Sequence, residues 1–458
     1  MDASAVALRA GIVGAGGAGF PTHVKLAAKA GCFIVNAAEC EPLIEVDKFL
    51  IRTRADDLVT ASIDIARGIG AGRLVFAIKK AYKTEIACLN TAIAARNSRV
   101  SPKADQDTPD ISLLEMRSFY PAGDEQLIVL LLTGKTVPER GIPLDVNTVV
   151  DNVGTVLNFF DAGMGEPVTH RVLSVTGAVN TPLMLRVPIG TDVRSCIDAA
   201  GGCTDGSTVI MGGPMMGTFY DFSETEKLSI RKTDGNILVL PPGHKLYAKS
   251  KMDMQKLKNR ARSACIRCRM CTDLCPRYLS GHDITPHTIM QNFYRLDKIT
   301  DNVEFAKAFG SALNCCECGV CENYACPMLL SPRRVNAGIK PILRERGIDI
   351  ERNMKPKKRD YLEERLVPTA RLTARLGLSR YARHLGNELT ELKPTRVNIL
   401  LKQHIGAPCV PCVQKGASVK TGDLIATPPE GKLGASLHAS IDGVVLALDN
   451  EAITLGSE

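Results

Sequence analysis

The 458-residue chain has no tryptophan, and only 5% of its residues are aromatic. Proteins that bind single-stranded nucleic acid without regard to sequence stack the bases on aromatic side chains, so this scarcity argues against a nucleic-acid partner. No uninterrupted run of 18 or more apolar residues occurs, which indicates that the chain has no membrane span. The first residues also lack the basic stretch and the apolar core of a secretory signal. Together these absences predict a cytoplasmic protein.

Cysteine, in contrast, is abundant. The chain has sixteen cysteines, and nine of them lie between Cys265 and Cys326. Because cytoplasmic thiols stay reduced, a dense group of cysteines in that compartment favours metal binding over disulfides. The remaining composition is that of an ordinary globular protein, with 45% hydrophobic and 23% charged residues. At this length we expect three or four domains rather than a single core.

The cysteines of this block form two closely spaced motifs. One reads C-x2-C-x2-C-x3-C from Cys265 to Cys275, the other reads C-x2-C-x2-C-x4-C from Cys315 to Cys326, and proline follows each. In two-cluster ferredoxins, three thiolates of one motif bind one [4Fe–4S] cluster and the fourth binds the other cluster. We therefore predict two clusters that exchange their fourth ligands. The predicted ligand sets are Cys265, Cys268, Cys271 and Cys326 for the first cluster, and Cys315, Cys318, Cys321 and Cys275 for the second.

A pair of zinc sites is the structural alternative. Zinc sites usually combine two CxxC units across a longer loop, and three cysteines at this spacing crowd a tetrahedral ion. The two Cys-Pro endings also favour clusters. Cys316 is out of register with both motifs and is interpreted as a bystander. The additional residue before Cys326 departs from the commonest spacing and leaves the environment of the second cluster open.

A second motif lies near the start of the chain, where residues 14–19 read G-x-G-x-x-G. A dinucleotide-binding fingerprint needs a strand before this motif and a helix after it. The preceding residues 5–9 are rich in alanine and favour a strand no more than a helix. The physical inference is therefore the broader one: small residues let backbone N–H groups approach a phosphate closely. Phosphate binding by a flavin or nucleotide is favoured, and a plain tight loop is the alternative.

Strand and helix patterns alternate after this loop. Residues 32–35 and 74–78 are short apolar runs typical of buried strands, and apolar residues at helical spacing lie between and after them. The first 160 or so residues therefore predict an α/β domain with a largely parallel sheet. Asn36, Glu39 and Glu41 follow the first strand, at the end where such sheets bind ligands. A role in surface solubility is the alternative for these acidic residues.

Four motifs precede the cysteine block, in the order GAGGAGFPTHVKL, NAAECEP, YPAGDEQL and VDNVGT. In this order they resemble the C subunit of the Rnf electron-transport complex and its relatives and, more distantly, the flavin subunit of respiratory complex I. The resemblance covers nearly the whole chain, and the basic stretch at about residues 333–396 is its least informative part. It implies a flavin and iron–sulfur oxidoreductase whose N-terminal domain binds FMN noncovalently and also binds NADH.

The resemblance also assigns individual residues. Gly14 and Gly16, together with Lys25, would lie along the phosphate side of FMN. The remaining flavin pocket would be formed by Asn36, Glu39, Tyr120, Gly123, Asp151, Asn152 and Thr155. The contacts to the nicotinamide nucleotide would come from Phe20, Glu41 and Glu125.

Two positions depart from the complex I relative. Ala15 stands where that relative has arginine, and Ala38 stands where it has aspartate. Both changes remove polar contacts, so the choice between NADH and NADPH stays open.

Two further segments carry resemblances of their own. Residues 171–240 resemble the small β-grasp ligand-binding domain of these proteins, and a structural spacer is the alternative. Residues 396–457 resemble the barrel-sandwich fold of biotinyl and lipoyl domains. The matching hairpin tip, residues 439–443, has no lysine to carry a swinging cofactor, so we interpret this domain as a docking or packing module. Cys409 and Cys412 are interpreted as bystanders, with a third metal site as the alternative.

Domain order separates the relatives. The Rnf protein has its barrel-sandwich domain before the flavin domain, whereas this chain places it last, as do the cobalamin reductases of the propanediol-utilisation microcompartment. That resemblance implies NADH-dependent reduction of cob(III)alamin or cob(II)alamin inside such a compartment. It implies a corrinoid-processing enzyme, such as an adenosyltransferase, as partner, and a shell protein as a second candidate. An Rnf-like subunit and a noncatalytic electron relay or scaffold are the alternative functions.

The predicted fold class is α/β and multidomain. It combines an α/β flavin-binding domain, a β-grasp domain, a helical ferredoxin-like domain with two clusters, and a C-terminal barrel-sandwich hybrid. The predicted boundaries are 1–165, 168–245, 253–335 and 396–458, with a basic linker and helices at 336–395. The net charge is +8, and Lys and Arg are concentrated between Arg333 and Arg383. We interpret this basic run as a solvated helical face rather than a partner-binding surface.

Overall fold

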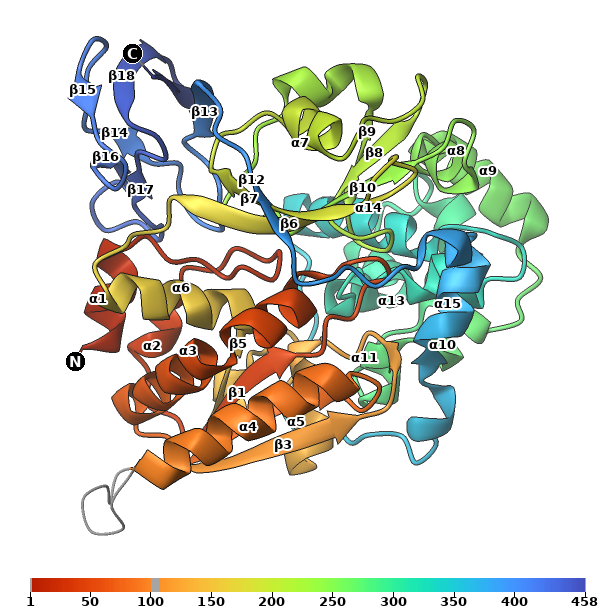
Figure 1. Ribbon diagram of the computed structural model, residues 1–458. Helices are drawn as coiled ribbons and strands as arrows, with labels where there is room; N and C mark the ends of the chain where they lie inside the picture. The colour runs from red at the N-terminus through yellow and green to blue at the C-terminus, as the bar shows by residue number, and fades with distance from the viewer. Residues whose placement is uncertain (1, 100–107, 458) are drawn as a thin grey trace.

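The computed structural model describes residues 2–99 and 108–457 (Figure 1). Its N-terminal domain is built on a four-stranded sheet in the order β3-β2-β1-β5, in which all neighbouring strands are parallel. The two central strands are buried along nearly their whole length, as apolar runs in parallel sheets are. The strands are β1 Cys32–Ala37, β2 Arg73–Lys79, β3 Asp110–Met116 and β5 Thr148–Asn152.

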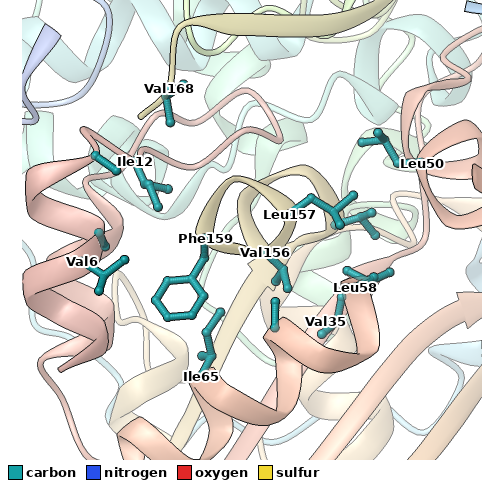
Figure 2. Packing of buried hydrophobic residues seen from close by; sticks show 14 of the residues in the cluster. Val6, Ile12, Val35, Leu50, Leu58, Ile65, Val156, Leu157, Phe159 and Val168 are labelled. Atoms are coloured by element: carbon teal, nitrogen blue, oxygen red, sulfur yellow. The ribbon is translucent and has the colours of Figure 1, made fainter. Parts of the chain in front are cut away.

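Helices cover both faces of this sheet. Phe33 and Val35 of β1 join a core formed with α3 and α6, part of which Figure 2 shows. Ile34, on the opposite face, packs in a second core with Leu127 and Val129 of α5. Side chains that alternate along one strand therefore enter two different cores. The helices of this domain are α1 Ala3–Arg9, α2 Thr22–Leu26, α3 Val46–Ile69, α4 Lys83–Arg99, α5 Glu125–Thr133, η1 Pro143–Val146 and α6 Val153–Gly163.

The second domain is a mixed six-stranded sheet in the order β12-β7-β6-β10-β8-β9, with one short helix packed on it. That helix is α7 Val193–Ala199, and the Asp192 side chain caps its first turn. The other elements are β6 His170–Gly177, β7 Leu183–Pro188, β8 Thr208–Met211, β9 Thr218–Asp221, η2 Phe222–Lys227 and β10 Asn236–Leu240.

The cysteine block lies in a helical domain. Phe293, Phe305, Phe309, Val335 and Ile339 are fully buried at its centre. The domain contains α8 Lys245–Ser250, α9 Met254–Ala264, α10 Met270–Asp273, α11 Pro276–Leu279, α12 Pro286–Asn292, η3 Phe293–Arg295, α13 Asn302–Phe309, η4 Gly310–Asn314, η5 Cys321–Ala325 and α14 Pro332–Glu345.

The segment that follows, residues 346–395, contributes to the neighbouring domains. Its strand β11 Val367–Pro368 pairs with β4 Phe119–Tyr120 of the N-terminal domain, and β12 Leu389–Glu391 extends the sheet of the second domain. Between them, α15 Thr369–Leu376 buries Leu372 in a core that also contains Tyr120. The segment therefore fixes the domains together in addition to joining them in sequence. It also contains η6 Glu363–Arg365 and η7 Ser379–Tyr381.

The C-terminal domain consists of two small antiparallel sheets, β13-β19-β18-β15 and β14-β16-β17. Its apolar residues belong to the same core as residues of α1 and α3. In Figure 1 this domain lies on the same side of the molecule as α1 and the N-terminus. The Ser440 hydroxyl donates to the Ile189 carbonyl at 2.6 Å, so the lysine-free tip packs against the β-grasp domain. The strands are β13 Arg396–Leu400, β14 Val410–Pro411, β15 Ser418–Val419, β16 Leu424–Thr427, β17 Leu437–His438, β18 Gly443–Leu448 and β19 Ala452–Gly456.

None of the helices in the described ranges combines the length and the apolarity that crossing a membrane requires.

Candidate functional site

The predicted flavin residues converge at the carboxyl end of the parallel sheet. Asn36 of β1 and Asn152 of β5 are paired in register, and Gly16 of the glycine-rich loop at residues 14–19 lies beside Asn152. The loop connects two helices, α1 and α2, rather than a strand and a helix. The loop therefore has the glycine spacing of a dinucleotide-binding motif but not its structure, which is a strand followed by a turn and a helix.

The loop is closed by its own backbone and attached to α6. Gly14 N–H donates to the Phe20 carbonyl at 2.9 Å, and Ala15 N–H donates to the Thr155 hydroxyl at 2.9 Å. A Cβ added to Gly16 would lie 3.3 Å from Cβ of Asn152, so a side chain at this position would crowd Asn152. Gly17 has a φ of +106° and faces open space. The loop thus leaves backbone room for a phosphate beside Asn152.

Lys25 is held by two acidic residues that the sequence also assigned to the site. Its Nζ lies 3.0 Å from Glu125 Oε1 and 3.4 Å from Asp151 Oδ1, and it donates to the Val150 carbonyl at 2.6 Å. Burial lowers the pKa of Lys25, but the charges of Asp151 and Glu125 outweigh burial and raise the pKa overall. For Asp151 burial acts in the other direction and raises the pKa to about 6, although the charge of Lys25 opposes this rise. Lys25 is therefore a fixed cation at the end of β5.

Asn36 connects β1 to the loop before α5. Its Nδ2 donates to the Gly123 carbonyl at 2.9 Å, and its Oδ1 accepts from Ala38 N–H at 3.2 Å. A Cβ added to Gly123 would lie 3.1 Å from Sγ of Cys40, so a side chain here would crowd that cysteine. Because both ends of the Asn36 amide are engaged, the backbone around the pocket is fixed before any ligand arrives.

Glu39 belongs to a small network of buried polar groups. It accepts from Asp47 N–H at 2.7 Å, and Asp47 in turn accepts from Asn152 Nδ2 at 2.7 Å. Burial, followed by the neighbouring Asp47 charge, raises the pKa of Glu39 well above its usual value. Lys79 donates to the Glu39 carbonyl at 2.9 Å, and burial lowers the pKa of this lysine to about 8. The network places two carboxyl groups and one cation together beyond the carboxyl ends of β1 and β2.

The three residues assigned to the nucleotide are placed differently. Phe20 adjoins the glycine loop, and Glu125 pairs with Lys25. Glu41 instead accepts from the backbone N–H groups of Met215 and Met216 in the β-grasp domain, at 2.7 and 3.1 Å. Burial raises the pKa of Glu41 to about 7, although these two hydrogen bonds oppose the rise. Glu41 and Glu125 are therefore held by different partners.

The eight predicted cluster cysteines form two groups in space. The charges that raise the pKa of Cys271 to about 12, after burial, are those of Cys326, Cys265 and Cys268. Cys265 and Cys326 pack against one apolar cluster, whereas Cys275 and Cys315 belong to another. The charges that raise the pKa of Cys321 include those of Cys315 and Cys275 and, more weakly, that of Cys271. The charges that act on Cys318 include those of Cys275 and Cys321. We call these the outer group and the inner group. The outer group is Cys265, Cys268, Cys271 and Cys326, and the inner group is Cys275, Cys315, Cys318 and Cys321.

The additional residue of the second motif is absorbed locally. Element η5, from Cys321 to Ala325, is a single π-helical turn that ends with a hydrogen bond from Cys326 N–H to the Cys321 carbonyl at 3.1 Å. In the first motif, α10 closes a tighter turn before Cys275. A π turn contains one residue more than an α turn, which accommodates x4 in place of x3. Cys326 can therefore reach the outer group despite the longer spacing.

The donor set suits iron–sulfur clusters. Four close thiolates repel one another, and positively charged iron offsets that repulsion and keeps the ligands deprotonated. Backbone N–H groups of Glu317 and Leu330 lie 3.4 Å from the sulfurs of Cys315 and Cys326, as donors to cluster ligands do. Across the described ranges, no three His, Cys, Asp or Glu side chains are arranged to hold a single metal ion.

The remaining cysteines have separate surroundings. Cys316 hydrogen bonds to Cys318; this contact, followed by the charge of Arg277, lowers the pKa of the Cys316 thiol to about 7 despite its burial. Cys409 is buried and donates to the Ala435 carbonyl, whereas Cys412 is exposed and donates to the Leu424 carbonyl. The last two thiols thus have different partners.

Several residues of the site were not identified from the sequence. Asp47 and Lys79 complete the network around Glu39, and Asp124 and Arg277 form an ion pair of 2.8 Å between the flavin domain and the cluster domain. Lys79 had a usable signal, because it is a charged residue at the carboxyl end of a buried strand. The Asp124–Arg277 pair had none, because the two residues meet only when the domains pack.

The fold and the two thiol groups together define the class of protein, an electron-transfer flavin and iron–sulfur protein. Four family models match successive parts of the chain. They are the Nuo51 FMN-binding domain over residues 8–161, the SLBB domain over 172–219, the 4Fe-4S dicluster domain over 264–331 and the RnfC barrel sandwich hybrid domain over 387–458. The predicted multidomain α/β architecture is confirmed.

Within this class, the chain belongs to the cobalamin reductase PduS family. It is 39% identical to the Citrobacter freundii cobalamin reductase PduS and 41% identical to the Salmonella typhimurium protein, each time over 97% of this chain and 94% of the relative. It is also 32% identical to the C subunit of the Na(+)-translocating ferredoxin:NAD(+) oxidoreductase complex of Acetobacterium woodii, over 63% of this chain and 61% of that relative. The predicted resemblance is confirmed.

One solved structure is similar at a lower level. A chain of the NAD+-reducing [NiFe]-hydrogenase in the H2-reduced state has a TM-score of 0.49 and 18% identity, covering 78% of this chain and 69% of that one. This likeness is too weak to assign a function.

Proposed function

We propose that this chain reduces cobalamin with electrons from NADH, by way of FMN and two [4Fe–4S] clusters. The observation that carries the proposal is the pair of cobalamin reductases that match 97% of the chain, flavin domain and barrel included. The reaction balances as NADH plus two cob(III)alamin giving NAD+, one proton and two cob(II)alamin. One two-electron donor thus serves two one-electron acceptors.

FMN, when bound, supplies the conversion between two-electron and one-electron transfer. The residues of this chain that would hold it are those gathered at the carboxyl end of the sheet. Gly14 and Gly16 leave backbone room for the phosphate, and Lys25 supplies a fixed positive charge near it. The other proposed contacts are Asn36, Glu39, Tyr120, Gly123, Asp151, Asn152 and Thr155.

The nucleotide would be positioned by Phe20, Glu41 and Glu125. In the chain alone, Glu41 and Glu125 already have partners, namely the backbone of Met215 and Met216 and the Lys25 side chain. Nucleotide binding would therefore exchange existing hydrogen bonds for new ones, which favours modest affinity. Ala15 and Ala38 offer no polar side chain, so the preference for NADH over NADPH depends on the remaining contacts.

The two thiol groups would each hold one [4Fe–4S] cluster with exchanged fourth ligands. Cys326 would serve with the first motif and Cys275 with the second, which is supported by the apolar cluster that Cys326 shares with Cys265 and the one that Cys275 shares with Cys315. This exchange locks the two motifs into one unit and keeps the clusters close for electron transfer. Cys316, although beside Cys318, is not needed to complete either set.

The direct test is an anaerobic assay of cluster-replete, FMN-loaded protein with NADH and hydroxocobalamin. We expect the cob(II)alamin spectrum to appear at two equivalents per NADH. No cobalamin reduction above that given by free FMN and NADH would contradict the proposal. NADPH in place of NADH measures nucleotide preference. The Asn36→Asp, Glu39→Ala double variant is expected to lose FMN while keeping the visible absorption of the clusters, which separates flavin loss from cluster loss.

The similarity to a component of an ion-translocating complex supports a second candidate, an Rnf-like subunit that passes electrons to partner subunits. Under that alternative, purified protein would reduce cobalamin only when partner subunits were added. Measuring bound flavin distinguishes the proposed reductase from a noncatalytic relay or scaffold, because the relay or scaffold would contain clusters but would not bind FMN.

The setting is part of the proposal. A corrinoid-processing enzyme, such as an adenosyltransferase, is the proposed partner, and a cytoplasmic microcompartment with its shell proteins is the proposed location. Copurification of this chain with shell proteins from its native cells tests the location directly.

A further inference from the structure

The two thiol groups differ in their access to solvent. Three inner cysteines are buried, with exposed fractions of 7% for Cys275 and 8% for both Cys318 and Cys321. In the outer group Cys268 is exposed, and its three companions are partly exposed. A cluster in the outer group would therefore lie nearest the surface.

The inner group faces the flavin domain. The Tyr120 hydroxyl, on a side chain only 1% exposed, donates to the Cys318 carbonyl at 2.7 Å. Tyr120 is also one of the residues proposed to contact FMN. Two residues after Cys275, Arg277 forms its ion pair of 2.8 Å with Asp124, which begins α5 of the flavin domain. We therefore expect electrons to pass from the flavin domain to a cluster in the inner group, and from there to a cluster in the outer group.

Around the outer group, two segments present apolar side chains to solvent. They are residues 266–270 and 327–329, and we call them together the exit face. Every residue in both segments is exposed. The large apolar members are Ile266 at 60%, Met270 at 42%, Met328 at 38% and Leu329 at 53%. Exposed apolar residues grouped in this way mark an interaction surface, and methionine suits one that must adapt.

The exit face is also positively charged. Arg267 and Arg269 lie within it, and Arg262 is exposed at the end of α9 just before it. Arg375 is exposed and donates to the Cys326 carbonyl at 3.3 Å. Asp273 pairs with Arg269 at 3.2 Å and balances one of these four arginines. The net positive charge favours a negatively charged partner.

We propose that electrons leave this chain at the exit face, and that the face docks a protein that carries the corrinoid and presents an acidic surface. That the partner carries a corrinoid rests on the proposed function, whereas the location of the face does not. A free corrinoid would need a concave pocket that buries its ring, and both segments are exposed at every position. Arginine and methionine around a small apolar centre are typical of protein interfaces, and redox partners use small ones.

The test uses two haem proteins of opposite charge as probes, the acidic soluble domain of cytochrome b5 and basic cytochrome c. Each NADH reduces two ferric haems, giving NAD+, one proton and two ferrous haems. The test variants are Arg262→Glu and Arg267→Glu in the holoprotein. The control is Arg73→Glu, the same charge change at an exposed position at the start of β2. Bleaching of the flavin by NADH is recorded for every variant.

At low ionic strength, we expect each test variant to weaken binding of immobilised cytochrome b5 by about tenfold and to slow its reduction similarly. Binding and reduction of cytochrome c should change in the opposite direction, and Arg73→Glu should change neither. Equal effects of Arg73→Glu, or no effect of the test variants, would overturn the proposal.

The same variants are then assayed with free hydroxocobalamin. We expect its reduction to be unaffected by the charge reversals. If it slows as much as cytochrome b5 reduction does, the exit face takes the free corrinoid and the protein partner is wrong. If cobalamin is never reduced while charge-dependent binding of cytochrome b5 persists, the proposed function fails and the docking surface stands. Binding is measured apart from turnover, so the two failures are distinguishable.

Discussion

The inner and outer thiol groups have nearly the same cysteine spacing and very different surroundings. The inner group is buried at a junction of domains, with a tyrosine hydroxyl on one of its carbonyls and a buried ion pair beside it. The outer group lies beneath exposed residues, and its nearest ion pair, Arg269 with Asp273, is half in solvent. A cysteine motif therefore specifies which thiols meet, whereas the packing of other domains decides what each cluster can exchange electrons with.

The comparison predicts its largest effect for removal of one ligand from each group. Cys268→Ala should remove the outer cluster and slow cobalamin reduction by more than about 100-fold, because the final acceptor loses its donor. Reduction of the flavin by NADH should continue. Cys318→Ala should remove the inner cluster and also lower the urea midpoint, because a buried junction loses its packing. Iron and sulfide analysis, stopped-flow bleaching of the flavin and urea unfolding measure the three quantities. Identical behaviour of the two variants would abolish the distinction between the groups.

The ion pairs provide the next largest contrast. Arg277→Met removes the charged partner of Asp124, which keeps only its hydrogen bonds from the Gln126 and Leu127 N–H groups, and should destabilise the protein by up to about 3–5 kcal/mol. Arg269→Met breaks the more exposed pair with Asp273 and should cost at most about 1 kcal/mol. Thermal and urea unfolding of the holoprotein measure both. Equal losses would mean that the inner junction is no more rigid than the outer surface.

The contacts that distinguish the two thiol groups could not be predicted from the sequence, and the reason is physical. Tyr120 and Cys318 are 198 positions apart, and Glu41 and Met215 are 174 apart. Such pairs depend on how finished domains pack, which no local pattern encodes. The glycine loop, the buried strands and the thiol motifs were predictable because each depends on residues close in sequence.

The second motif shows the same division within a few residues. Its additional residue was visible in the sequence, but its consequence was not, because x4 spacing is compatible with a displaced ligand or with a wider turn. The π turn from Cys321 to Ala325 is the solution that the chain adopts. In residues 346–395 the sequence showed even less. Their basic composition predicted a linker, but two short strands in this segment pair with strands of other domains.

A smaller effect is expected for the hydroxyl that connects the flavin domain to the inner group. Tyr120→Phe removes the hydrogen bond to the Cys318 carbonyl and should lower stability by about 1–2 kcal/mol. It should also shift the reduction potential of the inner cluster and leave that of the outer cluster unchanged, because only the inner loop loses a contact. Tyr247→Phe, which removes a hydroxyl that contacts Asp221 rather than a residue of either thiol group, is the matched control. Potentiometric titration followed by electron paramagnetic resonance resolves the two clusters, and equal shifts of both would argue against the assigned direction.

The smallest effect concerns pH and Glu41, the carboxylate that joins the flavin domain to the loop beside the inner group. Burial raises the pKa of Glu41 from the usual 4.5 to about 7, so the folded protein binds this proton more tightly than the unfolded chain does. Its contribution to stability is therefore greatest below about pH 4.5 and declines as the pH rises to 7. Because the side chain is partly exposed, we expect a decline of about 1 kcal/mol or less.

Glu41→Gln isolates that decline, since glutamine cannot titrate. Asp47 and Asp151, whose pKa values are also raised to about 6, are present in both proteins and cancel in the difference. Urea unfolding at pH 5, 6, 7 and 8 should show Glu41→Gln gaining on the unmodified protein as the pH rises. Asp273→Asn removes a negative charge on the outer side and should show no such trend. A difference that is flat across this range, or that falls with pH, would mean that Glu41 is not held in the contact with the Met215 and Met216 N–H groups.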